Sequence, residues 1–224
     1  SDRNRYRHET CTWSAQLEGA VRVLWELAPV LRDVGSRIDL EPHFDTTTFE
    51  LVRIAETVGS DICGISLDTA NVMLFGEHPI DAIRRAAPYT HLTHLKDAFL
   101  FFGEQGLRRQ TMPPGGGAID WETGLSILAE FEPDLPLSIE DHKWLFGAEI
   151  FEPWWHAEQQ DLSREELART VSLAAQGQRE ILTGVRPDPD EYETIPHIDE
   201  VEERLAAGRD HLRGVLAKLA GRVE

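Results

Sequence analysis

The chain has 224 residues, enough to bury a substantial core in one or two domains. Its 40 acidic residues against 22 basic ones give a formal net charge of −18, which disfavours the basic surface that nucleic-acid binding requires. No apolar run approaches the length of about 18 residues that a membrane span needs, and no signal peptide is recognisable. Two cysteines without a pattern, Cys11 and Cys63, favour a reducing, cytoplasmic compartment.

Helices and strands are predicted to alternate up to residue 140. Apolar residues at helical spacing predict a first helix, and short apolar runs with polar ends predict strands between further helices. Ile65 and Leu67, on one parity of the second strand, are expected to bury against the outer helices. The expected elements are helices at 13–34, 46–58, 79–87 and 120–131, and strands at 38–41, 64–68, 92–97 and 137–140.

The remaining segments are less regular. A long insertion follows the third strand and contains Met-Pro-Pro-Gly-Gly-Gly, which we interpret as a flexible lid rather than a phosphate cradle because no helix begins directly after it. A capping box, Ser-Arg-Glu-Glu, predicts the start of a late helix. The segments are a loop at 1–12, the glycine-rich run at 112–117, an aromatic loop at 141–162, a helix at 163–183, a linker at 184–197 and a charged helix at 199–220.

Each of the four predicted strands ends on a residue that can bind a divalent cation. These residues are Glu41, Asp68, His94 and Glu140. Carboxylate oxygens and one imidazole nitrogen form a mixed donor set suited to such ions. Steps of 27, 26 and 46 residues separate them, the last lengthened by the insertion. One βα unit takes roughly 30 residues, so the candidate ligands recur once per unit, as at the C-terminal face of a (β/α)8 barrel.

The predicted fold is therefore α/β, the C-terminal half of a (β/α)8 TIM barrel. About four βα units occupy residues 1–183, and residues 184–224 form a linker and a C-terminal helical extension. Four parallel strands alone would leave open edges and an uncovered inner face. We expect the missing N-terminal half-barrel to come from an N-terminal segment or a partner chain, and we expect an oligomer.

Five short motifs resemble the xylose-isomerase-like TIM-barrel superfamily of sugar isomerases and epimerases. In order they are Leu40-Glu41-Pro42-His43, Leu67-Asp68-Thr69-Ala70-Asn71, His94-Leu95-Lys96-Asp97, Gly-Ala-Ile-Asp-Trp at 117–121, and Ser138-Ile139-Glu140-Asp141. They cover about residues 13–183 at βα spacing. The resemblance implies a divalent ion, Mn²⁺ before Mg²⁺ or Co²⁺, on Glu41, Asp68, His94 and Glu140.

The resemblance also implies a metal-dependent isomerase or epimerase acting on a small carbohydrate. Glu41 and Glu140 would flank the sugar and exchange protons with adjacent carbons, while the ion stabilises an enediolate. A C-glycoside deglycosidase, or a dehydratase-type lyase acting on a keto-sugar or keto-inositol, would use the same site. An endonuclease IV-like nuclease and a non-catalytic barrel subunit are the alternatives from other classes. Neither a nucleic acid nor a membrane is expected as a partner.

Three further residues are candidates for the site. His43 shares the strand parity of the ligand two residues before it, and is either an additional acid/base or a loop histidine that caps a helix. Asn71 stands three residues past the second ligand, where related epimerases often carry a histidine, and is a candidate substrate contact. Lys96 shares the parity of the third ligand. It could bind a hydroxyl, carboxylate or phosphate, or form a structural salt bridge with Asp97 or another acid.

Overall fold

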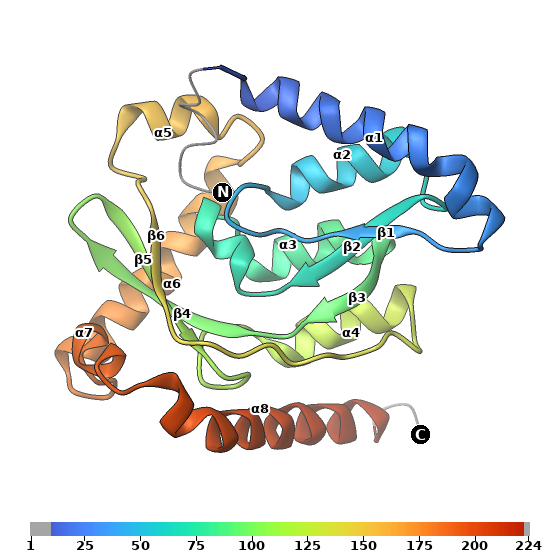
Figure 1. The fold of residues 1–224 in the computed structure, drawn as a ribbon. Helices are drawn as coiled ribbons and strands as arrows, with labels where there is room; N and C mark the ends of the chain where they lie inside the picture. Colours follow the sequence, from blue (N-terminus) through green and yellow to red (C-terminus); the bar gives the residue numbers. More distant parts are fainter. Residues whose placement is uncertain (1–9, 222–224) are drawn as a thin grey trace.

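The computed structural model describes residues 10–221 (Figure 1), so most of the loop expected at 1–12 lies outside the described residues. A parallel sheet runs in the order β1–β2–β3, with Asp68 and His94 as paired residues at its C-terminal edge. The predicted strand–helix alternation is thus present. The elements of this first part are α1 (Trp13–Asp33), β1 (Ile38–Leu40), α2 (Thr48–Val58), β2 (Cys63–Asp68), η1 (Asn71–Phe75), α3 (Pro79–Ala86), η2 (Ala87–Tyr89) and β3 (Thr90–His94).

The helices pack in sequence along one side of this sheet. α2 and α3 contact β2, α1 packs on α2, and α4 (Trp121–Phe131) packs on α3. The Thr47–Glu50 capping box fixes the start of α2, because each side chain accepts a hydrogen bond from the other residue's backbone N–H. Ile65 and Leu67 are fully buried in the core, on the helix side as their parity predicts.

The fourth predicted strand, at residues 137–140, is reduced to a single bridge. Leu95 pairs with Ile139 in parallel, and Leu95 N donates to Ser138 O at 2.7 Å. The expectation of a full strand was wrong because a side chain intervenes in the ladder. Ser138 N donates to Thr93 Oγ1 at 3.1 Å, so a hydroxyl takes the place of a backbone carbonyl.

A second sheet lies where the sequence predicted an insertion and an aromatic loop. It is antiparallel, runs in the order β4–β5–β6, and has α6 (Arg164–Leu182) packed against β4. The sequence prediction missed it because β5 buries polar side chains, Arg109, Gln110 and Thr111, and so lacks an apolar alternation. The strands are β4 (Asp97–Gly103), β5 (Gly106–Met112) and β6 (Leu145–Ala148).

The glycine-rich run at 112–117 is held in place by Asp97, which corrects the expectation of a flexible lid. The buried Asp97 carboxylate accepts hydrogen bonds from Gly115 N at 2.9 Å, Ile119 N at 3.2 Å and Trp121 Nε1 at 2.8 Å. A Cβ atom at Gly117 would lie 2.1 Å from Asp97 Oδ1, so only glycine permits this approach. The Gly115 N–H, which could have donated to a bound phosphate, donates to the Asp97 carboxylate instead.

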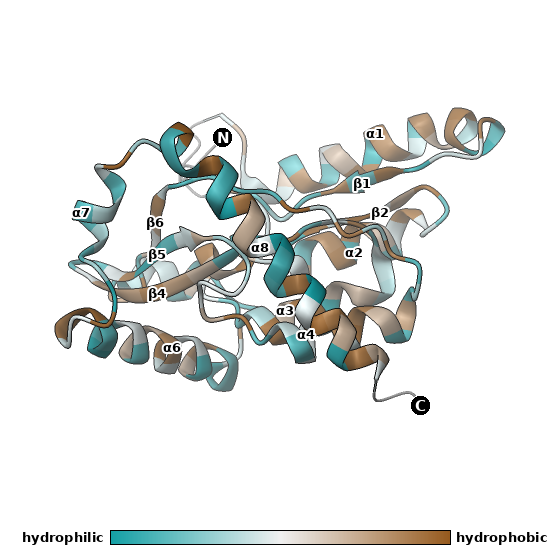
Figure 2. Cartoon of the chain, turned by 90° about the horizontal axis from the view of Figure 1, so that it is seen from below, coloured by the Kyte–Doolittle hydropathy of each residue, from teal (hydrophilic) through white to brown (hydrophobic). Residues whose placement is uncertain are grey.

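The C-terminal part contains more helix than predicted. The expected linker includes α7 (Pro189–Glu193), the aromatic loop includes α5 (Pro153–Glu158), and α8 (His197–Ala220) begins two residues early. α8 packs on α4 and runs past the 137–140 segment (Figure 1). The helix contains both hydrophilic and hydrophobic residues, as the cartoon seen from below shows (Figure 2). Within residues 10–221, no helix combines the length and hydropathy needed to span a membrane.

A buried carboxylate, Glu77, links α2 to the α3 region. It accepts hydrogen bonds from Thr48 N at 3.1 Å, from the Thr48 hydroxyl and from Arg85 Nη1 at 2.6 Å. Complete burial is the main cause that raises its pKa from 4.5 to about 7, and these donors only partly oppose the rise. The folded chain therefore holds a proton on Glu77 at pH values where the unfolded chain has lost it.

We expect the Glu77→Gln variant to lose part of the pH dependence of stability. Because the folded-state pKa lies above the unfolded value, the unfolding free energy of the wild type should fall as pH rises from 4.5 to about 7. Relative to the variant, the unfolding free energy of the wild type should fall by at most about 1.4 kcal/mol per pH unit. Urea unfolding at half-unit pH steps measures it, with the exposed Glu130→Gln as control. Parallel curves for wild type and Glu77→Gln would contradict the assignment.

Candidate metal centre

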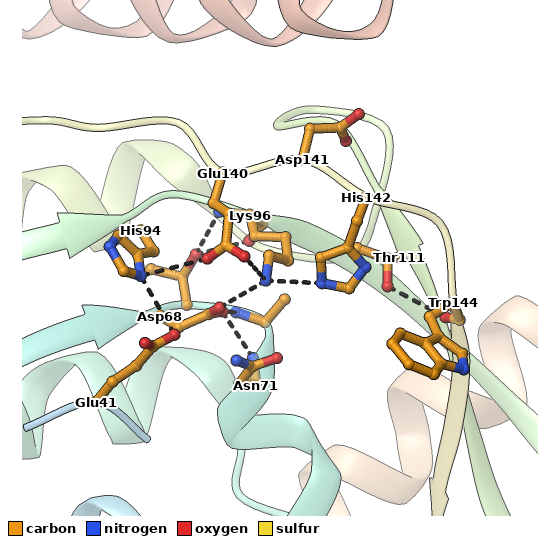
Figure 3. A network of polar contacts seen from close by, with 12 residues as sticks. Glu41, Asp68, Asn71, His94, Lys96, Thr111, Glu140, Asp141, His142 and Trp144 are labelled. Atoms are coloured by element: carbon orange, nitrogen blue, oxygen red, sulfur yellow. Dashed lines mark hydrogen bonds and ion pairs between the residues drawn. The ribbon is translucent and has the colours of Figure 1, made fainter. Parts of the chain in front are cut away.

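The four predicted ligands meet at the C-terminal ends of the parallel strands (Figure 3). Asp68 and His94 end adjacent strands in register, Glu41 directly follows β1, and Glu140 directly follows the bridge to Leu95. One ligand atom from each of the four lies within 4.8 Å of all the others. Parallel strands bring their last residues to one edge, so spacing along the chain becomes proximity in space.

His94 supplies the clearest sign that a cation fits. Its Nδ1 lies 3.2 Å from Glu41 Oε1 and 3.3 Å from Glu140 Oε2. This nitrogen is buried, yet within residues 10–221 it makes no hydrogen bond of acceptable geometry. Buried polar atoms normally have a partner. A divalent ion would serve the imidazole nitrogen and both carboxylates together, since all three are electron-pair donors.

Asp68 has the most hydrogen bonds of the four candidate ligands. Its Oδ1 accepts hydrogen bonds from Ala70 N and Asn71 N, each at 2.9 Å, and its Oδ2 accepts one from Lys96 Nζ at 2.7 Å. The carboxylate is fully buried. With both oxygens occupied, Asp68 is suited to hold an ion rather than to carry a proton.

Lys96 lies inside the ligand set. Its Nζ contacts Asp68 Oδ2 at 2.7 Å, Glu140 Oε1 at 3.2 Å and His142 Nε2 at 2.9 Å, which occupies all three ammonium protons. It is only 1% exposed. The structural salt bridge expected as the alternative is present, with Asp68 and Glu140 as its acids rather than Asp97, whose carboxylate faces the glycine-rich run. As placed, Lys96 orients ligand carboxylates, and contact with a substrate would require it to release one of these partners.

Asn71, the candidate substrate contact, is fixed by an arginine that the sequence did not point to. Arg109 Nη1 donates to Asn71 Oδ1 at 2.9 Å, while its Nε and Nη2 make no hydrogen bond among the described residues. The guanidinium is fully buried, which lowers its pKa to about 10, so it stays charged at neutral pH. Because Asn71 Oδ1 is committed to Arg109, only the amide Nδ2 remains to donate to a substrate.

His142 was also missed. Burial, followed by the charges of Lys96 and Arg109, lowers its pKa to about 4, so the ring is neutral at pH 7. Nε2 then accepts from Lys96 and the proton sits on Nδ1. A signal was present in the sequence, because His142 stands two residues past Glu140, on the same parity that singled out Lys96 and His43.

His43 lies outside the ligand cluster. β1 ends at Leu40, so the strand parity assumed for His43 does not persist, and the side chain is exposed. Its ring packs edge-on against Phe44, with 4.0 Å between centroids. Phe44 in turn packs against Trp144 at 6.2 Å and Phe146 at 4.7 Å. His43 therefore borders an aromatic wall formed by Phe44, Trp144 and Phe146.

Several known proteins are similar to this chain. YihM, an uncharacterized protein of Escherichia coli K12, is 30% identical over 107 residues, which cover 46% of this chain and 33% of YihM. A xylose isomerase domain protein from Planctomyces limnophilus is 29% identical, with a TM-score of 0.47 over 55% of this chain and 46% of that one. A xylose isomerase-like TIM barrel protein from Mycobacterium smegmatis, solved in complex with magnesium, is 20% identical, with a TM-score of 0.50 over 71% of this chain and 52% of that one.

The match to these proteins is partial in length. This chain spans about half or less of each of them, as the covered shares of 33%, 46% and 52% show. The family model described as "Xylose isomerase-like TIM barrel" matches residues 3–168, which contain all four residues of the candidate metal centre. The chain belongs to the xylose isomerase-like TIM barrel family.

Proposed function

We propose that the protein is a divalent-metal-dependent sugar isomerase or epimerase that acts by proton transfer next to a carbonyl. The observation that carries this proposal is the convergence of three carboxylates and one imidazole within 4.8 Å at the strand ends. A set of oxygen donors with one nitrogen donor suits Mn²⁺, and Mg²⁺ or Co²⁺ are the alternatives. Magnesium is also the ion in the Mycobacterium smegmatis structure.

The two glutamates differ from Asp68 in a way that suits proton transfer. An ion held here would polarise a carbonyl and its neighbouring hydroxyl, which makes the adjacent C–H more acidic. Glu41 and Glu140 are partly exposed, whereas Asp68 is buried with both oxygens occupied. The glutamates also come from the first and last of the four strand segments, on either side of His94 (Figure 3). One can remove a proton and the other can return one.

A lyase that cleaves a C-glycoside of a keto-sugar is the second candidate. The aromatic wall of Phe44, Trp144 and Phe146 favours it, because an aryl leaving group could stack there beside His43. Trp144 is 55% exposed, so its ring is accessible. Incubation in D₂O separates the two reactions. Deuterium uptake by a ketohexose without bond cleavage supports the isomerase or epimerase, and aglycone release from a 3-keto C-glycoside supports the lyase.

Metal removal should abolish either activity. Dialysis of the complete protein against EDTA is expected to stop deuterium incorporation, and Mn²⁺ should restore it, because the carboxylates alone cannot polarise the carbonyl. Calorimetry should find one Mn²⁺ bound in the wild type, and Asp68→Ala should lose it. Activity unchanged by chelation, with no Mn²⁺ bound, would refute the proposed function.

A further inference from the structure

The C-terminal extension holds the segment that carries the fourth ligand. Residues 137–140 form one bridge rather than a ladder, so the backbone near Glu140 has few sheet contacts. Beyond it the side chains alternate, with Glu140 and His142 toward the candidate metal centre and Asp141 away from it (Figure 3). Extended backbone produces this alternation. The outward residues therefore contact other parts of the chain.

Asp141 meets a buried arginine of α8. Arg204 donates from Nε to Asp141 Oδ2 and from Nη2 to Asp141 Oδ1, both at 2.7 Å, and His197 Nε2 lies 2.8 Å from Oδ2. The Asp141 side chain is 1% exposed and that of Arg204 is 5% exposed. A bidentate guanidinium–carboxylate pair fixes orientation as well as distance. Arg204 Nη2 also reaches His142 O at 3.3 Å.

Lys143, the next outward residue, is also held by the C-terminal part of the chain. Its Nζ donates to Tyr192 O at 2.5 Å, Ile195 O at 3.0 Å and Glu200 Oε2 at 2.8 Å, and it lies 3.8 Å from the Tyr192 ring centroid. All three ammonium protons are thus used. The acceptors come from α7, the turn after it and α8, the region that the sequence suggested was a simple linker and a charged helix.

We propose that α7 and α8 act as a positioning strap for the candidate metal centre. Arg204, acting through Asp141, sets the position of Glu140 and of His142, and Lys143 anchors the other end of the segment. This inference rests on the proposed function, because it assigns Glu140 as a ligand. The strap lies beyond residues 3–168, the region that the family model matches, so the family resemblance does not include it.

The test compares Arg204→Ala with Arg209→Ala in the complete protein. Arg209 is on the same helix, 51% exposed, and pairs only with the neighbouring Asp210 among the described residues. Arg204→Ala should weaken Mn²⁺ binding by about 10–100-fold, the usual effect of losing a group that orients a ligand. Arg209→Ala should bind as the wild type does. Calorimetry gives the affinities, and circular dichroism of the metal-free proteins shows that each variant is folded.

Amide hydrogen exchange of peptides covering 138–146 provides a readout without metal. Exchange in this segment should rise in Arg204→Ala and stay unchanged in Arg209→Ala. If Arg204→Ala does not fold, Asp141→Asn, which keeps the shape but loses the charge, takes its place in both measurements. A folded variant with wild-type exchange at 138–146 would overturn the proposal that α7 and α8 position this segment. Failure of the wild type to bind Mn²⁺ would instead refute the proposed function, while the exchange result still decides whether the strap exists.

Discussion

Replacing Glu140 by glutamine should slow deuterium incorporation into a ketose substrate by about 10²–10⁴-fold, the usual contribution of a positioned acid or base. Mn²⁺ affinity should fall far less, because the amide oxygen can still serve as a ligand. Glu41→Gln should behave similarly, since it flanks His94 from the other side. The rate is measured by mass spectrometry of the sugar after incubation in D₂O, and the affinity by calorimetry on the same preparations.

The control for this pair is Glu130→Gln, which changes an exposed glutamate on α4 and should leave rate and affinity unchanged. If Glu140→Gln and Glu41→Gln turn over at near-normal rates, the two carboxylates only hold the ion. His43, whose exposed ring packs against Phe44, would then be the next candidate for the base. Loss of metal affinity as large as the loss of rate would mean that proton transfer cannot be separated from ligation in these variants.

The convergence of the four candidate ligands could be predicted from the sequence, because it depends mainly on where each strand ends. Strand ends recur at βα spacing, and parallel pairing places Asp68 directly beside His94. The remaining two ligands need only follow the first strand and the fourth segment at the same edge. The single bridge at Ile139 is enough to bring Glu140 to this edge, without a full ladder at residues 137–140. Polar residues at the ends of apolar runs were therefore a sufficient signal.

The surroundings of the site could not be found in this way. The antiparallel sheet has Arg109 and Gln110 buried in β5, so burial there does not follow hydropathy. Arg109 is recognisable as part of the site only once the fold places it beside Asn71. The pair of Asp141 with Arg204 joins residues 63 positions apart, and nothing in the motif that contains Asp141 indicates this partner. Sequence spacing carries no information on such long-range polar pairs.

The other half of the barrel stays a prediction. Within the described residues, β1 pairs with β2 alone, and α1 exposes apolar side chains that include Val23, Trp25 and Val30. An adjoining βα unit would pair with the free edge of β1 and cover this face of α1, as neighbouring units do in a barrel. Such a unit would also limit access of solvent to the partly exposed Glu41.

The Asp97→Ala variant should lose about 3 kcal/mol or more of unfolding free energy, because each buried donor left without a partner costs about 1–3 kcal/mol. Three such buried donors face this carboxylate, namely Ala98 N, Ile119 N and Trp121 Nε1, and the N–H of the exposed Gly115 also donates to it. Part of the loss is offset, since burial disfavours the charged carboxylate and raises its pKa. The net effect remains destabilising because alanine offers the three N–H groups no acceptor.

Asp120→Ala is the matched control for Asp97→Ala. Asp120 caps α4 through hydrogen bonds to Thr123 N at 3.1 Å and Thr123 Oγ1 at 2.7 Å, but it is exposed. Loss of such a cap costs about 1 kcal/mol. Urea unfolding of both variants compares a buried and an exposed aspartate that serve adjacent segments. Equal destabilisation would show that Asp97 acts only as another cap. A larger loss for Asp97→Ala, with faster amide exchange at 113–119, would show that this carboxylate holds the glycine-rich run in place.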